Sequence, residues 1–302
     1  MFIEPNEYII IMDMNSDEIE RRITYDDMCK LRDAGVKTLY FQAAIRWELM
    51  QPTPDAPFCW DIVDGWVNKA RRVGLKMLIP FIYSIPPWKP DEYFFSREQV
   101  EKAYGVPNYE NKEVSEEFDR MIKEAIERYS GDDCQVINAI PCNGELAFHI
   151  WTYDNKFHCP EDVLIDFIIE RQKLFEAQHN EIWTAYHPYT DPLYWKPVYN
   201  ALFETFPNST HYGIIFTYVQ RNERHFFEKI KYNQDRGMIY YGGTEYIQGM
   251  RQNVPKLISG NMRMLTAPKH PYQHIANVNE WTRNEIRWAL GEYEKERLFI
   301  NV

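Results

Sequence analysis

Short apolar runs alternate with amphipathic stretches from one end of the chain to the other. This alternation is typical of a parallel sheet, in which each buried strand is followed by a helix with one apolar face. The pattern predicts strands over residues 8–13, 36–42, 76–82, 134–140, 182–186, 211–217, 238–242 and 262–267. It predicts helices over residues 25–34, 60–73, 114–129, 161–178, 194–206, 223–235, 253–258 and 280–296.

Glycines punctuate this pattern at helix ends. Gly35, Gly74 and Gly237 each follow a predicted helix and precede a predicted strand. Glycine is favoured there because it adopts the left-handed backbone conformation that ends many helices. The repeated order of helix, glycine and strand strengthens each separate assignment.

Eight strand-and-helix pairs with right-handed crossovers close naturally into a (β/α)8 TIM barrel. A doubly wound open sheet is the alternative, but it usually has fewer units, and its Gly-rich nucleotide loops do not occur in the sequence. No linker or low-complexity tract divides the chain. We therefore expect one α/β domain over residues 1–302, with long loops after the third and fourth strands.

The composition of the chain limits the classes of molecule that it is expected to bind. Hydrophobic residues make up 45% of the chain and charged residues 26%, which suits a folded globular protein. A net charge of -11 argues against a nucleic acid partner, and no apolar run is long enough to span a membrane. The five cysteines are irregularly spaced, which favours reduced thiols and a cytoplasmic location. No cofactor is expected.

Aromatic residues are abundant, at 16% of the chain. Flat aromatic faces stack against sugar rings, although they also fill protein cores. The predicted loops after the third and fourth strands are rich in them: Trp88, Tyr93, Phe94, Phe95, Phe148, Trp151, Tyr153 and Phe157. These loops could wall a carbohydrate site or form an oligomer interface, and the sequence leaves the oligomeric state open.

Two carboxylic acids follow predicted strands on opposite sides of the barrel mouth. Glu145 comes after the fourth strand and Glu245 after the seventh. Active sites of such barrels lie at the carboxyl ends of the strands, and glycoside hydrolysis needs one acid to protonate the leaving oxygen and another to attack or to activate water. The alternative is that both are ordinary surface acids among 45 Asp and Glu.

A resemblance to a known family supports the first interpretation. The segment from Val36 through Arg46, Trp47, Pro52, Trp60, Asp61 and Asp64 to Lys76, and the segment from Ile79 to Trp88, resemble the retaining β-glycosidase superfamily called clan A, and in particular its β-galactosidase branch. The resemblance implies that Arg46 supports the nucleophile. It implies that Glu145 is the acid/base, Glu245 the nucleophile and Tyr218 a hydrogen-bond partner of the nucleophile.

The chain departs from this family at two places. Gly144 separates Asn143 from Glu145, and the segment Gly144–Glu145–Leu146 is similar instead to the acid segment of β-amylases, which invert the anomeric configuration. Pro268, Lys269 and His270 stand where the family usually has Trp after the eighth strand. The sequence therefore supports the pair of catalytic carboxylates more strongly than it supports a mechanism that retains the anomeric configuration.

The sequence thus predicts a glycoside hydrolase with Glu145 and Glu245 as catalytic residues. The predicted substrate-binding residues are Arg46, Trp47, Tyr83, Trp88, Asn143, Trp151, His187, Tyr218, Tyr246 and His270. One alternative is a non-catalytic carbohydrate-binding or structural barrel. A weaker one is a metal-dependent barrel hydrolase using Cys142, His149, His158 and Cys159, whose spacing matches no standard zinc site.

A glycine pair precedes Glu245. Gly242 and Gly243 predict either a β-bulge that aims the carboxylate or a phosphate-binding loop near the last strands, and the bulge is the favoured interpretation.

Overall fold

The structure is a computed structural model of the chain. It describes residues 9–13, 24–42, 45–100, 103–138, 161–186, 192–215, 230–244, 250–260, 263–266, 269–270, 273–276 and 278–300.

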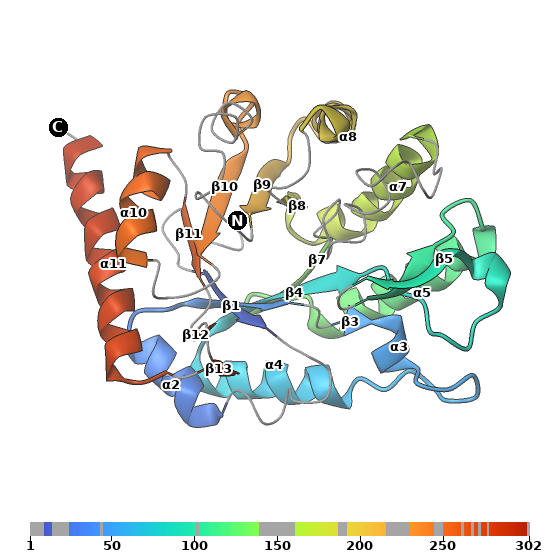
Figure 1. Ribbon diagram of the computed structural model, residues 1–302, viewed down its shortest axis with the longest axis horizontal. Coiled ribbons are helices and arrows are strands. Elements are labelled where there is room, and N and C mark those ends of the chain that lie inside the picture. Colours follow the sequence, from blue (N-terminus) through green and yellow to red (C-terminus); the bar gives the residue numbers. More distant parts are fainter. Residues whose placement is uncertain are drawn as a thin grey trace.

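A curved parallel sheet forms the centre of the molecule (Figure 1). Its nine strands follow the order β3-β4-β2-β1-β11-β10-β9-β8, with β7 paired to the other side of β4. All of these pairings are parallel. The strands are β1 (Ile9–Asp13), β2 (Thr38–Gln42), β3 (Ile45–Arg46), β4 (Lys76–Ile82), β7 (Cys134–Ile137), β8 (Glu181–Tyr186), β9 (Thr210–Ile215), β10 (Ile239–Thr244) and β11 (Arg263–Thr266).

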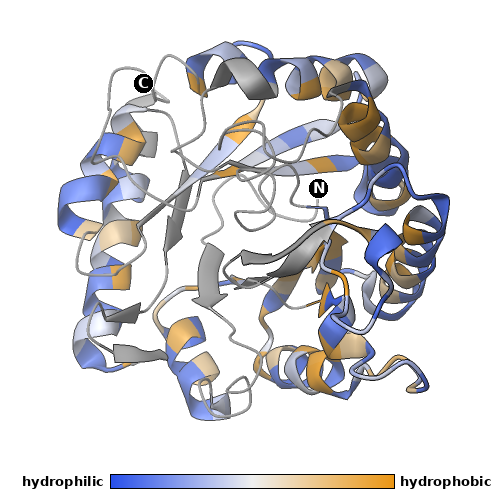
Figure 2. Ribbon diagram, turned by 45° about the vertical axis from the view of Figure 1, so that its right-hand side comes forward, coloured by the Kyte–Doolittle hydropathy of each residue, from blue (hydrophilic) through white to orange (hydrophobic). Residues whose placement is uncertain are grey.

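Helices surround the strands on the outside (Figure 1). They are α2 (Tyr25–Asp33), α3 (Trp47–Met50), α4 (Asp61–Val73), α5 (Lys112–Tyr129), α7 (Glu161–His179), α8 (Pro192–Thr205), α10 (Met250–Ser259) and α11 (Glu280–Ile300), with a short 3-10 helix η1 (Asp91–Tyr93) and a helical turn at 230–234. Figure 2 shows apolar residues gathered on the helix sides that face the strands. This segregation is expected when one face of each helix is buried.

Strand β1 pairs with both β2 and β11, so the first and last strands of this sheet in chain order are neighbours. This pairing joins the amino-terminal and carboxyl-terminal parts of the chain in one sheet. Within the part of the chain that the structure describes, no pairing joins β7 to β8. Helix α7, which connects these two strands, packs against both of them.

The eight predicted strands are confirmed, with differences of a few residues at their ends. The helix predictions are confirmed too, except that only residues 230–235 of the sixth predicted helix lie within the described residues, and of these 230–234 are helical. Seven elements were not predicted: β3, α3, η1, the antiparallel pair β5 (Phe94–Val100) and β6 (Ala103–Pro107), and the antiparallel pair β12 (Lys269–His270) and β13 (Gln273–Ala276). Most of them are too short to carry a clear hydrophobic period, and β5, with the sequence FFSREQV, does not alternate regularly between apolar and polar residues.

The predicted bulge at the glycine pair is wrong. Gly242 pairs with Met264 and Gly243 with Leu265, in a register that continues unbroken from Tyr241 to Thr244. Glycines tolerate regular extended backbone as well as bulges, so the pair did not require an irregularity. Strand β10 therefore runs straight to its end at Thr244.

The predicted helix stops are confirmed. Gly74 is the C-cap of α4 with a φ of 82°, in the left-handed region. Gly35 has a φ of 104° just after Ala34, the C-cap of α2, and Gly237 has a φ of 97°. An L-residue would be strained at these angles, which explains why glycine recurs there.

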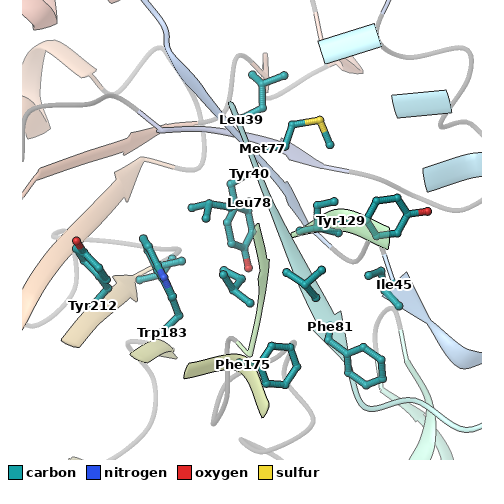
Figure 3. Close-up of a cluster of buried hydrophobic side chains, with 14 of the residues drawn as sticks. Leu39, Tyr40, Ile45, Met77, Leu78, Phe81, Tyr129, Phe175, Trp183 and Tyr212 are labelled. Atoms are coloured by element: carbon teal, nitrogen blue, oxygen red, sulfur yellow. The ribbon is translucent and has the colours of Figure 1, made fainter. Parts of the chain in front are cut away.

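The inner face of the sheet is lined by large aromatic side chains (Figure 3). Trp183 stacks on Tyr212 with ring centroids 4.3 Å apart, and Tyr241 lies 6.0 Å from Trp183. Tyr40 of β2 pairs with Leu78 of β4 and is likewise buried. These side chains fill the interior, so the amino-terminal and middle parts of the strands form packed core.

Three cysteines fall within the described residues, namely Cys29, Cys59 and Cys134, and each is a free thiol. In the same part of the chain, no helix combines the length and the apolar character needed to cross a bilayer.

Candidate functional site

The described part of the candidate site lies where β3 and β4 end. Tyr40 of β2 pairs with Leu78 of β4, and Ile45 of β3 pairs with Phe81 of β4. The first partners are five residues apart in the sequence and the second partners only three, so the register shifts between the two pairs. After the shift Arg46 lies opposite Ile82, at the carboxyl end of β4. Strand irregularities of this kind commonly re-aim side chains next to active sites.

Register places Arg46 on the inner side of the sheet. Phe81 packs against Phe118 of α5 and Phe175 of α7, so it faces the helices. Ile45 pairs with Phe81 and shares that side. Successive residues of a strand point to opposite faces, and Arg46 therefore faces inward, away from the helices.

A small polar cluster forms around Arg46. Its guanidinium Nη1 lies 3.4 Å from Oε1 of Glu48, and the two side chains are only 7% and 17% exposed. The hydroxyl of Ser84, which is fully buried after β4, donates a hydrogen bond to the other carboxylate oxygen of Glu48. The positively charged guanidinium of Arg46 and the neutral hydroxyl of Ser84 thus hold the Glu48 carboxylate in one orientation.

The electrostatics of Glu48 are set by competing effects. Burial raises its pKa above the ordinary value for glutamate, while Arg46 and the Ser84 hydroxyl act in the opposite direction and offset part of the rise. Burial disfavours a charge because it removes water, and a nearby cation favours one. The net direction is upward, which moves the ionisation of Glu48 towards neutral pH.

An aromatic cage lies beside this cluster. The ammonium group of Lys89 is 4.5 Å from the ring centroid of Trp47, 5.1 Å from that of Trp88 and 4.7 Å from that of Tyr93. Cations bind the faces of aromatic rings through the ring quadrupole. The cage joins Trp47 of α3 to the segment after β4. Burial of the Lys89 ammonium lowers its pKa below the ordinary value for lysine.

Gln51 strengthens the same junction. The indole N–H of Trp47 donates to the side-chain oxygen of Gln51 at 2.9 Å, and the indole N–H of Trp88 donates to its backbone carbonyl at 3.3 Å. Trp88 itself is half-buried. Of the predicted aromatic site residues within the described part of the chain, it is the one that is not buried.

Two other predicted substrate-binding residues belong to the hydrophobic core. Trp47 is fully buried and packs on Phe118 at 5.6 Å. Tyr83 is 3% exposed and packs on Phe118 at 5.1 Å, and its hydroxyl donates to Asn138 Oδ1 at 3.2 Å. Their rings pack against helix α5, and their predicted contact with a sugar stays a prediction.

Both predicted catalytic residues lie outside the described residues. Strand β10 ends at Thr244, directly before Glu245, and the described part of the β7 region ends at Asn138, before Glu145. Of the other predicted site residues, Asn143, Trp151, His187, Tyr218 and Tyr246 also lie outside, and His270 is placed by its backbone in β12. Cys142, His149, His158 and Cys159 lie outside as well.

No group of three or more His, Cys, Asp or Glu side chains suited to a metal ion occurs among the residues that the structure describes.

Sequence reasoning missed Glu48 and Lys89. Glu48 is one of 45 acidic residues and directly follows Arg46 and Trp47, so only its adjacency to that pair could have singled it out. Lys89 follows Trp88 in the same way. Their roles depend on which segments the sheet brings together, and this information is not local.

Neither a protein-family model nor a curated protein matches this chain. Solved structures of low sequence identity do resemble it. A β-galactosidase from the psychrophilic Marinomonas ef1 matches over 98% of this chain with a TM-score of 0.62 and 12% identity. The catalytic domain of a β-amylase from Paenibacillus polymyxa matches over 87% of this chain and 92% of its own, with a TM-score of 0.58 and 10% identity.

A xylanase from Cellvibrio japonicus matches over 95% of this chain and 98% of its own, with a TM-score of 0.58 and 10% identity. The chain spans 60% of the length of the Marinomonas β-galactosidase. At these identities the likeness shows the fold alone. The resemblance to β-galactosidases and β-amylases that the sequence predicts is therefore confirmed at the level of the fold.

Proposed function

We propose that this chain is a retaining glycoside hydrolase built on one closed (β/α)8 barrel, with Glu245 as nucleophile and Glu145 as acid/base. The observation that carries the proposal is the fold. Parallel strands whose carboxyl ends bear a polar cluster share their arrangement with several glycosidases. In barrels of this kind, catalytic side chains stand at the carboxyl ends of the strands.

Closure of the barrel is part of the proposal. Strands β8, β9, β10, β11, β1, β2, β4 and β7 already follow one another in chain order around the sheet. A single pairing, between β7 and β8, would complete the ring. Helix α7 packs against both strands and holds them on the same side of the molecule. Glu145 and Glu245 would then stand on opposite sides of one mouth.

The reaction follows from the two acids. The carboxylate of Glu245 attacks the anomeric carbon, the bond from that carbon to the leaving oxygen breaks, and Glu145 gives its proton to that oxygen. Water then transfers a proton to Glu145 and attacks the anomeric carbon, which releases Glu245. Trp88 would stack on the sugar, and Arg46 would stabilise the nucleophile, as the family resemblance implies. Asn143, Trp151, His187, Tyr218, Tyr246 and His270 would complete the sugar site.

Turnover of chromogenic β-glycosides and of a panel of oligosaccharides tests the proposal. The unmodified protein should release product, and Glu145→Ala and Glu245→Ala should each lose most of that activity. A crystal soaked with the cleaved oligosaccharide would give the distance between the two carboxyl groups. About 5 to 5.5 Å agrees with retention, whereas about 6.5 to 9.5 Å would move the assignment to inversion, as in the β-amylase-like alternative.

The rival function is carbohydrate binding without catalysis. Gly144 and the segment from Pro268 to His270 favour it, because both depart from the pattern of the catalytic family. Sugar binding with no turnover on any substrate of the panel would establish this rival and overturn the hydrolase.

A further inference from the structure

Lys89 links one partly exposed ring to two buried ones. Its ammonium group lies 5.1 Å from the ring centroid of Trp88, 4.5 Å from that of Trp47 and 4.7 Å from that of Tyr93. Trp47 is fully buried, Tyr93 is 7% exposed, and Trp88 is half-buried. One ammonium group thus contacts all three rings, and it belongs to the residue that follows Trp88 in the chain.

The two buried rings are fixed by other contacts as well. The indole N–H of Trp47 donates to the side-chain oxygen of Gln51 at 2.9 Å, and its ring packs on Phe118 at 5.6 Å. The hydroxyl of Tyr93 donates to a carboxylate oxygen of Glu113 in α5 at 2.8 Å. Both rings are therefore held in place, and each attracts a nearby cation through its quadrupole.

Trp88 is held by fewer contacts. Its indole N–H donates to the backbone carbonyl of Gln51 at 3.3 Å, which is long for such a hydrogen bond. Among the residues that the structure describes, Trp88 has no ring-to-ring contact with either of the two buried rings. The ammonium group of Lys89 is therefore the group through which both buried rings act on Trp88.

We propose that Lys89 is a positioning residue for Trp88: its ammonium group holds the indole ring in the orientation from which it stacks on a sugar, so that sugar affinity depends on a positive charge at residue 89. The inference deepens the proposed function and rests on it, because it takes Trp88 as the stacking residue. A ring that is already held still loses less conformational freedom when a sugar binds, and this saving strengthens binding. Lys89 acts through Trp88 rather than on the sugar itself.

The protonation of Lys89 controls this contact, because a neutral amine has no charge for the rings to attract. Burial lowers the pKa of Lys89 below the ordinary value for lysine. Of the charges that act on it from α5, Glu117 and Glu113 oppose this shift and Arg120 adds to it. Tyr93 of η1 stays neutral, since its own pKa is raised to about 12. As the pH rises, Lys89 therefore loses its proton before an ordinary lysine does.

The test measures the sugar affinity and the Trp88 ring separately. NMR titration gives the dissociation constants of galactose and cellobiose, and the indole N–H signal of Trp88, identified by its absence in Trp88→Phe, reports on the ring. Lys89→Met keeps most of the side-chain volume but removes the charge. We expect it to shift and broaden the Trp88 signal and to weaken sugar binding by about 2- to 30-fold, the range that one cation–π contact corresponds to. Lys89→Arg keeps the charge and should retain both the signal and the affinity.

A matched control comes from a second lysine that lies over a tryptophan. Nζ of Lys69 is 5.4 Å from the ring centroid of Trp66, and both residues belong to α4. Lys69→Met removes the same charge from a similar contact outside the candidate site. Its sugar affinity and its Trp88 signal should equal those of the unmodified protein.

Raising the pH tests the unmodified protein without a substitution. Between about pH 8 and 10.5, its sugar affinity should fall with a midpoint below about 10.4, the ordinary pKa of lysine. Lys89→Arg should keep its affinity over this range because a guanidinium stays protonated. Lys89→Met should bind weakly at every pH. Circular dichroism at each pH checks that the fold is intact.

The outcomes separate the two proposals. If Lys89→Met binds sugar as well as Lys69→Met does, or if Trp88→Phe binds as well as the unmodified protein, the inference about Lys89 is overturned and the hydrolase stands. If the unmodified protein neither binds nor cleaves any sugar of the panel, the proposed function fails, and the Trp88 signal then decides alone. A signal that shifts in Lys89→Met and returns in Lys89→Arg upholds the positioning of Trp88, whereas an unchanged signal overturns it.

Discussion

The indole ring of Trp183 stacks on the phenol ring of Tyr212, with centroids 4.3 Å apart and planes only 18° from parallel. The two residues are paired across neighbouring strands β8 and β9. Figure 3 shows the two rings side by side in the buried core, and Tyr241 extends the stack with its centroid 6.0 Å from that of Trp183. These close-packed rings form the core beside β8, β9 and β10.

Trp183→Ala should destabilise the fold strongly. Trp183 is 1% exposed, so truncation removes a large apolar surface and leaves a cavity. We expect a loss of about 3 to 5 kcal/mol in the free energy of unfolding. Trp281 on α11 is 43% exposed, and Trp281→Ala should cost no more than about 0.5 kcal/mol. Urea unfolding followed by circular dichroism measures both, and equal losses would contradict the close packing of this core.

Two glycine substitutions should have opposite signs. Gly65 lies inside α4, where an added Cβ would meet nothing within 4 Å. Gly65→Ala should stabilise the protein by about 0.5 to 1 kcal/mol, because alanine is the better helix former. Gly213 in β9 lies against the ring of Tyr240, which an added Cβ would strike. Gly213→Ala should cost about 1 to 3 kcal/mol. Thermal unfolding distinguishes the two.

Glu48 predicts a pH dependence of stability. Burial holds its pKa in the folded protein above the unfolded value. The stability that this group contributes is then fully present below the unfolded pKa, near 4.3, and is lost as the pH rises through the folded pKa. Glutamine does not titrate. The free energy of unfolding of Glu48→Gln, relative to the unmodified protein, should therefore rise with pH over this range, and a flat difference would contradict the raised pKa.

Azide should separate the duties of the two proposed catalytic acids. In Glu245→Ala no glycosyl-enzyme forms, so azide can attack the substrate directly and give a glycosyl azide of inverted configuration. In Glu145→Ala the first step survives for a good leaving group, and azide should give a product of retained configuration. Proton NMR of the products identifies the anomers. If both variants gave glycosyl azides of the same configuration, the assignment of Glu245 as nucleophile and Glu145 as acid/base would be wrong.

Thiol labelling should follow burial. Cys134 opens β7 and is fully buried, and burial raises the pKa of its thiol to about 12. Cys59 is exposed. Because the thiolate is the reactive form, iodoacetamide at neutral pH should alkylate Cys59 in the native protein and leave Cys134 unmodified until denaturant is added. Peptide mass spectrometry reads each site separately, and early labelling of Cys134 would show that the start of β7 is open.

The amino-acid sequence alone determined the order of strands and helices along the chain. Apolar runs and amphipathic periods depend on neighbouring residues, and the glycines at 35, 74 and 237 mark backbone angles that other residues avoid. These local signals placed all eight main strands. They also placed Arg46 after the second predicted strand and Trp88 in the loop after the third. In the structure Arg46 ends β3, and the indole N–H of Trp88 donates to the backbone carbonyl of Gln51, just after α3.

Tertiary structure decided how those strand ends combine. Glu48 and Ser84 lie 36 residues apart, and they meet only because β3 restarts its pairing beside the end of β4. Tertiary packing also places the rings of Trp47 and Tyr83 against Phe118 of α5, a contact that the sequence did not predict. A side chain at a strand end can face either the mouth or the helices, and register, which depends on distant pairing, makes that choice.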